Sequence, residues 1–154
     1  MAQPMRIGLI SDTHGLLRPQ ALDALAGVDR IIHAGDIGNA GVLEALAAIA
    51  PVDAVRGNND TGAWAAAIPH DLNLDYAGVG IYLLHDIKEL KGRMPPVRVV
   101  IAGHSHQPLV LEQDGVLRVN PGSAGPRRFK LPVTVGLLEI VDGRVSAAII
   151  PLAV

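Results

Sequence analysis

The chain alternates between short aliphatic runs and polar breaks that contain glycine. Aliphatic runs at residues 5–10, 30–34 and 52–56 have the length and composition of buried strands. Pro19 suits the first turn of a helix that places Leu22 and Leu25 inward. Asn39 can cap a second helix, which ends before Pro51. Three strand–loop–helix units in sequence favour βαβ crossovers and a partly parallel sheet.

The rest of the chain has the pattern of antiparallel strands. Ala77-Gly78, Asp114-Gly115 and Asp142-Gly143 are turn dipeptides between apolar runs. The strands predicted there are residues 72–76 with 79–84, 97–102, 109–113 with 116–120, and 133–141 with 144–152. Internal repeats, low-complexity tracts and linkers are absent from the sequence. We therefore expect one domain over residues 1–154, with βα units first and antiparallel strands after them.

Composition narrows the class of protein. Apolar residues make up 49% and charged residues 18%, which predicts a folded chain. A net charge of −2 gives no long-range attraction to a nucleic-acid backbone, so no nucleic-acid surface is expected. The absence of cysteine excludes disulfides and thiolate metal sites. The apolar runs are too short to span a bilayer and no signal-peptide core is evident, so we expect a cytoplasmic protein without a membrane partner.

Side chains that could bind a metal follow directly after the predicted strands. These are Asp12, His14, Asp36, Asn58, His85, His104 and His106. Ligands of open α/β sheets bind beyond the carboxyl ends of the strands, so we expect these side chains at one edge. Imidazole and carboxylate groups without sulfur suit Mn, Fe, Zn or similar divalent ions.

Each signal also has a purely structural interpretation. Asp12 and Asp36 could do no more than form turns at strand ends, and residues 57–60 could be an ordinary loop. The pair His104 and His106, two residues apart after a strand, favours metal binding more strongly. The coincidence of all these signals is more specific than any one of them.

Two histidines and a basic cluster fall outside this pattern. His33 lies within a strand, where we expect a packed or hydrogen-bonded histidine, and His70 lies in a predicted loop. Neither is assigned a role. Arg127, Arg128 and Lys130 form one short basic cluster, for which a solvated loop and a phosphate contact are both open.

The ordered motifs resemble the calcineurin-like metallophosphoesterase superfamily, whose pattern runs D-x-H, G-D, G-N-H-D/E, H and G-H-x-H. The motifs of this chain are Asp12-Thr13-His14, Gly35-Asp36, Gly57-Asn58-Asn59-Asp60, His85 and Gly103-His104-Ser105-His106. The short length and the run Asn120-Pro121-Gly122-Ser123 are similar to the small YfcE-type phosphodiesterase branch. The retromer vacuolar sorting subunit shares that fold. The resemblance covers about residues 5–150.

The resemblance implies an α/β fold, a four-layer αββα sandwich of two mixed β-sheets flanked by helices. It also implies a dinuclear centre of two divalent metal ions, Mn²⁺ being the first choice and Fe, Zn, Ni or Mg the alternatives. One ion would be held by Asp12, His14 and His106. The other would be held by Asn58, His85 and His104, with Asp36 bridging both. Two cations about 3.5–4 Å apart can share a hydroxide and clamp the phosphoryl oxygens for in-line attack.

Two positions depart from the family pattern. Family members often have His where this chain has Asn59, and that His is thought to protonate the leaving group. Asn59 has no titratable proton, so a water or Asp60 would have to supply one; we name Asn59 and Asp60 as catalytic positions. Asp86 follows His85 where the family commonly has Gly, and it adds negative charge near the phosphate site.

The function expected from these observations is a phosphodiesterase, a metal-dependent phosphoric diester hydrolase acting on a small phosphate-ester substrate. A phosphomonoesterase, such as a nucleotide or sugar phosphatase, is the nearest alternative. A catalytically silent interaction scaffold of the same fold is an alternative of another class. Loss of ligands would be expected in a scaffold, yet all seven candidate positions carry competent side chains. A homo-oligomer is left open.

Overall fold

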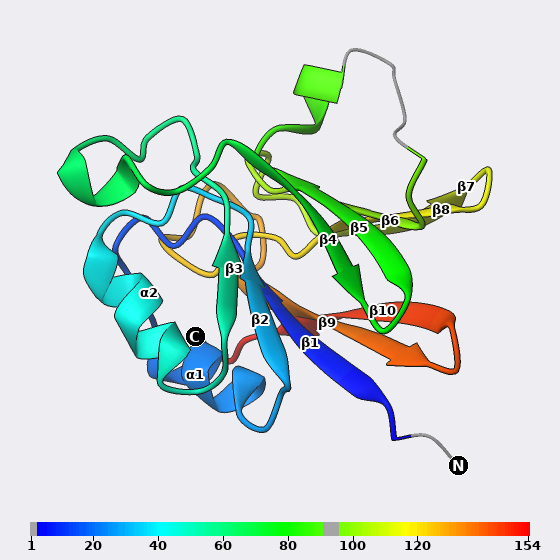
Figure 1. The fold of residues 1–154 in the computed structure, drawn as a ribbon. Coiled ribbons are helices and arrows are strands. Elements are labelled where there is room, and N and C mark those ends of the chain that lie inside the picture. The colour runs from blue at the N-terminus through cyan, green and yellow to red at the C-terminus, as the bar shows by residue number, and fades with distance from the viewer. Residues whose placement is uncertain (1–2, 91–95) are drawn as a thin grey trace.

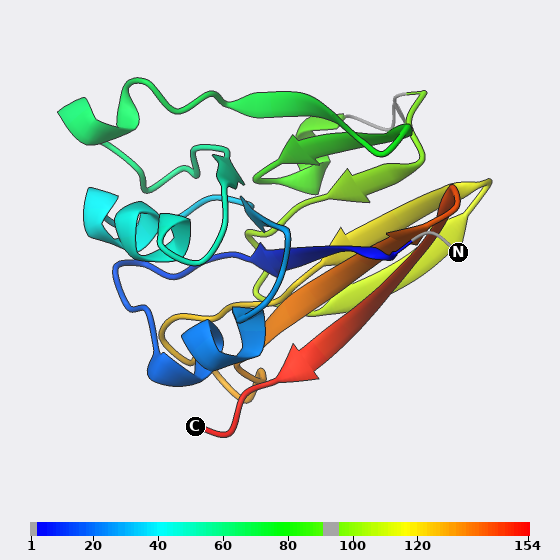
Figure 2. The ribbon, with the colours of Figure 1, turned by 60° about the horizontal axis from the view of Figure 1, so that its bottom comes forward.

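A computed structural model describes residues 3–90 and 96–154 and contains two five-stranded mixed β-sheets, which face one another (Figures 1 and 2). The first sheet has the order β10-β9-β1-β2-β3. Its strands are β1 (Met5–Ile10), β2 (Arg30–His33), β3 (Val52–Ala54), β9 (Thr134–Val141) and β10 (Arg144–Pro151). The pairs β1–β2 and β2–β3 are parallel, as the predicted crossovers require, and β9 and β10 add an antiparallel edge.

The second sheet has the order β4-β5-β6-β8-β7. Its strands are β4 (Asp71–Tyr76), β5 (Val79–Leu84), β6 (Val99–Ile101), β7 (Leu109–Gln113) and β8 (Val116–Asn120). Strands β5, β6 and β8 run parallel, while β4 and β7 pair with their hairpin partners in antiparallel fashion. All the predicted strands are therefore present. Those predicted at 52–56 and 97–102 are shorter than expected, because the residues at their ends lie in loops and are not paired with a neighbouring strand.

Two helices cover the first sheet, α1 (Pro19–Leu25) and α2 (Ala40–Ala47). Pro19 opens α1 and the Asn39 side chain caps α2 by accepting a 3.2 Å hydrogen bond from the Val42 N–H, as the sequence predicts. Two 3₁₀ turns complete the helical elements, η1 (Ala63–Ala65) and η2 (Ile87–Leu90). No helix of the described residues is long and apolar enough to cross a membrane.

The hydrophobic core is divided by the sheets into layers. Ile7 and Leu9 of β1 pack between the two sheets, whereas Ile10 packs under the helices. Gly8 lies against α1 so closely that an added Cβ would meet the Leu25 side chain at 2.5 Å. On the outer face of the second sheet a smaller cluster includes Val100 and is covered by η2. The α/β class with two mixed sheets is confirmed, and its helical layers are thin.

The parallel strands bring their carboxyl ends to one edge, where backbone hydrogen bonds join the loops. The N–H of Asp12 donates to the Gly35 carbonyl at 3.0 Å, which ties the loop after β1 to the loop after β2. The N–H of Ala124 donates to the Ser11 carbonyl at 3.0 Å, which ties the segment after β8 to the first sheet. Loops from both sheets therefore form one continuous edge.

Candidate metal centre

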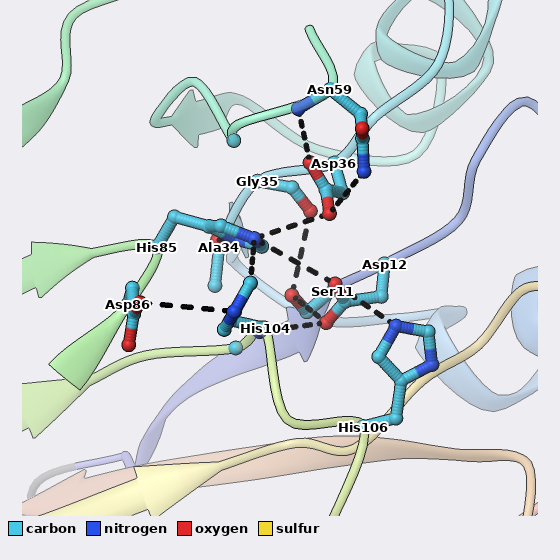
Figure 3. A network of polar contacts seen from close by, with 12 residues as sticks. Ser11, Asp12, Ala34, Gly35, Asp36, Asn59, His85, Asp86, His104 and His106 are labelled. Atoms are coloured by element: carbon cyan, nitrogen blue, oxygen red, sulfur yellow. Dashed lines mark hydrogen bonds and ion pairs between the residues drawn. The ribbon is translucent and has the colours of Figure 1, made fainter. Parts of the chain in front are cut away.

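Five of the seven predicted ligands have an unusual backbone conformation. Asp12, His14, Asp36, His104 and His106 have φ angles of 54°, 47°, 55°, 71° and 63°. Residues other than glycine rarely adopt this left-handed backbone conformation, and those that do are concentrated at functional sites. Figure 3 shows Asp12, Asp36, His104 and His106 reaching from loops of both sheets toward a common region.

Asp12, His14 and His106 form the first group of candidate ligands. The Asp12 Oδ1 atom lies 3.5 Å from His106 Nε2 and 4.0 Å from His14 Nε2. Asp12 Oδ1 and His14 Nε2 are buried and have no hydrogen-bond partner. The other Asp12 oxygen is well satisfied, because it accepts from the Ser11 hydroxyl at 2.7 Å and from the His104 N–H at 3.1 Å. One oxygen is thus anchored and the other is left for a cation.

Asp36, His85 and His104 form the second group. The His85 Nε2 atom lies 3.2 Å from Asp36 Oδ2 and 3.3 Å from His104 Nδ1. On its far side the His85 ring donates through Nδ1 to the Ala34 carbonyl at 2.7 Å, which leaves Nε2 as the ligand atom. The far nitrogen of His104, Nε2, lies 3.7 Å from Asp86 Oδ2.

Asp36 lies between the two groups. Its Oδ2 atom is 3.7 Å from His14 Nε2 in the first group and 3.2 Å from His85 Nε2 in the second. Asn59 holds this carboxylate, since its backbone N–H donates to Oδ1 at 2.9 Å and its side-chain amide donates to Oδ2 at 3.2 Å. Its Oδ2 atom is therefore close to ring nitrogens of both groups.

Asn58 and Asp60 flank Asn59 and have different surroundings. Asn58 is exposed and lines the same cleft as His85 and His104, so it can complete the second group. Asp60 is buried, and its carboxylate accepts three backbone N–H bonds. The donors are Ile37 at 3.0 Å, Gly38 at 3.0 Å and Gly57 at 2.9 Å. Asp60 therefore holds the loops after β2 and β3 together, and its role as a proton donor stays a prediction.

Two glycines allow the loops to approach closely. A Cβ added at Gly57 would lie 2.2 Å from the Asp36 backbone nitrogen, and one added at Gly103 would lie 2.0 Å from the Ser11 hydroxyl. Both distances are far below contact, so any side chain would displace a candidate ligand or the residue that supports it. This explains the glycine in each of the two motifs.

Sequence reasoning did not assign roles to Asn120 and Ser123, which support the ligand loops. The Asn120 side-chain amide donates to the Gly103 carbonyl at 3.0 Å, and the Ser123 hydroxyl donates to the Asp12 carbonyl at 3.1 Å. The signal was present in the run of residues 120–123, but its contacts depend on loops 17 and 111 positions earlier in the chain.

The electrostatics of the cluster favour bound cations. Burial raises the pKa of Asp12, although the Ser11 hydroxyl and nearby histidines oppose this shift. Burial acts in the same direction on Asp36, but hydrogen bonds from His85 and the Asn59 N–H outweigh it and hold the pKa well below its usual range. Burial lowers the pKa of His85, yet its hydrogen bonds and the two carboxylates raise the net value above normal. A cation would stabilise both buried carboxylates.

The donor chemistry of both groups therefore fits divalent cations. The candidate ligands are nitrogen and oxygen atoms without sulfur, a set that suits first-row divalent ions. Two observations support this fit. Asp12 Oδ1 and His14 Nε2 are buried without hydrogen-bond partners, while the other oxygen of Asp12 and the Nδ1 atom of His85 are hydrogen-bonded to neighbouring groups. This is the usual arrangement around protein metal sites.

The two histidines without an assigned role lie outside this cluster. His33 is fully buried; its Nδ1 accepts from the Gly35 N–H at 3.1 Å and its Nε2 lies 3.0 Å from the Thr13 hydroxyl. Burial lowers its pKa to about 3, so the ring is neutral. His70 is exposed in the loop before β4 and contacts Glu89. Both placements are as predicted.

Comparison with known proteins agrees with these motifs. A sequence model of the calcineurin-like phosphoesterase superfamily domain matches residues 5–143. A probable metallophosphoesterase of Methanothermobacter thermautotrophicus is 33% identical over 160 residues, covering 95% of this chain and 92% of that protein.

Solved structures show the same fold. An archaeal phosphodiesterase superposes with a TM-score of 0.78 at 25% identity, covering 95% of this chain and 100% of that one. YfcE, a phosphoesterase of E. coli, has a TM-score of 0.70 at 22% identity, with coverage of 96% and 100%. Vacuolar protein sorting 29 of Cryptosporidium parvum has a TM-score of 0.77 at 19% identity, with coverage of 95% and 96%. The chain belongs to the calcineurin-like phosphoesterase superfamily.

Proposed function

We propose that the protein is a phosphodiesterase that requires two divalent metal ions and hydrolyses a phosphodiester by in-line attack of hydroxide. The observation that carries this proposal is the position of the Asp36 carboxylate, 3.2 Å and 3.7 Å from ring nitrogens of two separate ligand groups. When bound, such ions would polarise the phosphoryl oxygens and lower the pKa of a water molecule that they share.

The residues of this chain hold the site before substrate arrives. Ser11 fixes Asp12, the Ala34 carbonyl fixes the His85 ring, and Asn59 fixes Asp36. Because these contacts are already made in the structure, the ligand atoms need little rearrangement on binding. Preorganised groups of this kind stabilise charge that develops in a transition state.

Two features favour a diester over a monoester. A phosphomonoester carries more negative charge, and the Asp86 carboxylate beside His104 would repel it. Asn59 lacks a titratable proton, so substrates with good leaving groups are favoured. The archaeal structure named a phosphodiesterase supports the same choice. A protein of Methanocaldococcus jannaschii that is 28% identical, over 88% of this chain and 93% of its own length, also carries the name phosphodiesterase.

A scaffold without catalysis is the second candidate, because the vacuolar sorting protein has the same fold. Buried polar atoms without partners, such as Asp12 Oδ1 and His14 Nε2, argue against it. Such atoms destabilise a protein unless a ligand satisfies them.

The test is metal analysis followed by an activity assay. The protein is stripped with a chelator, reloaded separately with Mn²⁺, Fe²⁺, Zn²⁺, Ni²⁺ or Mg²⁺, and assayed on bis(p-nitrophenyl) phosphate and p-nitrophenyl phosphate. We expect about two ions per chain and faster turnover of the diester. Faster monoester cleavage would establish a phosphomonoesterase instead. Full metal content without turnover of either ester would favour the scaffold.

A further inference from the structure

A cleft of about 400 Å³ opens beside the metal centre, on the outer face of the second sheet. Val100 of β6 and Arg118 of β8 lie on this face, next to each other in the parallel ladder. Phe129 and Leu131, from the segment between β8 and β9, form another wall. A cleft of this volume accommodates a small organic group rather than a single water or ion.

The cleft is continuous with the candidate metal centre. His104 and Asp86 line it, and both also line the neighbouring cleft that contains Asn58 and His85. A phosphoryl group at the metal centre could therefore place one of its ester arms in the cleft. Figure 3 shows Asp86 and Asn59 on different sides of His85. Since Asn59 occupies the position associated with the leaving group, the arm in the cleft is the one that stays on the phosphorus.

Two guanidinium groups give the cleft positive charge. Arg118 stands between Val100 and Leu111 of the adjacent strands. Within residues 3–90 and 96–154, neither Arg118 nor Arg128 forms a salt bridge. The carboxylate in the cleft, that of Asp86, is engaged with His104. The guanidinium donors are therefore available to carbonyl, hydroxyl or phosphoryl oxygens of a ligand.

Arg128 lines the same cleft as His104, a candidate ligand of the second group. It is therefore placed to contact the ester arm of a phosphate bound at the metal centre.

Phe129 is the aromatic group at this cleft. It is the one phenylalanine in the chain, its side chain is 89% exposed, and its φ angle is 53°. A bulky residue in the left-handed region is a genuine outlier, and an exposed phenyl ring gains nothing from the core. Such strain is retained where it serves a site. The ring offers a flat surface on which an aromatic ligand can stack.

We propose that this cleft binds a nucleoside arm of the substrate, with the base against Phe129 and its oxygen atoms near Arg118 and Arg128. The proposal rests on the phosphodiesterase function and names its substrate class, a phosphodiester of a single nucleoside. A flat apolar wall together with guanidinium donors matches a base that carries carbonyl groups. A net charge of −2 and a cleft of this volume favour a mononucleotide ester over a polymer.

The test compares esters that share one leaving group and differ in the retained arm. The substrates are methyl p-nitrophenyl phosphate and thymidine 5′-(p-nitrophenyl) phosphate. In both, a water-derived oxygen bonds to phosphorus, the bond from phosphorus to the aryl oxygen breaks, and p-nitrophenolate leaves. Stacking of one base on an aromatic ring contributes about 1–3 kcal/mol, so we expect kcat/KM of the thymidine ester to exceed that of the methyl ester by about 10-fold or more.

The ratio of the two kcat/KM values is then measured in F129A and R118Q. It should fall about 5-fold or more in each. R144Q, at an exposed position of β10, is the matched control and should keep the ratio. A ratio near one in the unaltered protein, or a ratio that neither variant lowers, would overturn the proposal.

Binding separates a failure of this inference from a failure of the proposed function. Thymidine 5′-(methyl phosphate), a diester whose leaving group is poor, is titrated into the metal-loaded protein by calorimetry. If neither ester is cleaved although metal content is complete, the phosphodiesterase function fails. The cleft is still supported if the nucleotide binds and F129A and R118Q weaken it about 5-fold or more while R144Q does not. Absent or equal binding in all variants would refute it.

Discussion

The Nε2 atom of His85 and the Oδ2 atom of Asp36 lie 3.2 Å apart, although the two residues belong to loops that follow strands of different sheets. The same Asp36 oxygen is 3.7 Å from His14 Nε2, so one carboxylate is shared by both groups of candidate ligands. Asp12 Oδ1 also approaches the second group, at 3.9 Å from His85 Nε2, but Asp36 Oδ2 lies closer to that ring, and both Asp36 oxygens are held by Asn59. The loss of this carboxylate should therefore affect both ions.

The first prediction is that Asp36→Asn abolishes turnover and lowers bound metal below the level of His14→Ala. The amide keeps the volume but loses the negative charge and one acceptor. Removal of an outer-shell partner alone costs about 10–100-fold in metal affinity, and loss of a bridging ligand should exceed that range. Metal content is measured by elemental analysis after gel filtration. Asp142→Asn, in a hairpin turn with φ of 50°, is the matched control; near-normal activity of the Asp36 variant would remove the bridging assignment.

The second prediction separates ligand histidines from the others. His70→Ala should retain full metal content, because this exposed ring contacts Glu89 and lies outside both groups. His33→Ala should lose about 1–3 kcal/mol of folding stability, since the Gly35 N–H loses its acceptor, but should bind metal when folded. His104→Ala serves as the positive control. If either of the first two variants loses metal as the third does, the ligand set is wrong.

The third prediction concerns pH. The pKa of His85 is raised in the metal-free protein, and a ligand histidine must be neutral. Metal binding therefore expels a proton from His85 at pH values up to its raised pKa, and affinity falls as the pH drops through that region. Turnover should also rise with pH as the attacking water ionises. Metal affinity and rate are measured from acid to alkaline pH; a flat rate with metal retained throughout would contradict both statements.

Much of this fold follows from local pattern. The run that forms β1 can be delimited from its aliphatic composition. Those that form β5, β7 and β8 can be delimited from turn dipeptides, because each hairpin turn has the glycine that its positive φ needs. Which sheet each hairpin joins does not follow. The pairing of β9 with β1 connects the two ends of the chain, and it is decided by packing of the intersheet core rather than by local sequence.

The site, like the fold, can be predicted from the sequence only in part. The ligand positions are predictable because each follows a strand, and parallel strands end at one edge. The contacts of Asp60 are not, since Ile37 and Gly38 meet it through the packing of a loop more than twenty positions earlier. The cleft at Phe129 could not be predicted either, because the sequence of the basic cluster is also compatible with a solvated loop. The structure places this segment beside the outer face of β8.

The fourth prediction concerns Asp86. Its Oδ2 atom lies 3.7 Å from His104 Nε2, and its Oδ1 accepts from the Lys88 N–H at 3.1 Å. Asp86→Asn can keep the second contact but removes the charge that would repel a phosphomonoester. We expect the ratio of monoester to diester kcat/KM to rise about 5-fold, as one unit charge a few ångströms away contributes about 1 kcal/mol in a solvated site. Glu112→Gln, on the exposed strand β7, should leave the ratio unchanged; an unchanged ratio in the Asp86 variant as well would show that this carboxylate does not select substrates.

The last prediction concerns Asn59, which donates two hydrogen bonds to Asp36 and has no proton to give to a leaving group. A positioned general acid contributes about 10²–10⁴-fold when the leaving group needs a proton. The unaltered protein should therefore cleave aryl diesters well and alkyl diesters slowly. Asn59→His should raise turnover of poor leaving groups more than that of good ones. The rates are measured on a series of diesters of rising leaving-group pKa, for both proteins.

The substitution also removes the amide that holds Asp36 Oδ2 at 3.2 Å, so metal content is measured in every preparation. Asn59→Ala is the control for this loss, since it removes the amide without adding an imidazole. A general acid flattens the dependence of rate on leaving-group pKa, whereas loosening of Asp36 lowers all rates together. Two results would show that position 59 does not govern protonation of the leaving group. One is the same slope of rate against leaving-group pKa in the His and Ala variants. The other is an equal change of rate on every substrate in the His variant.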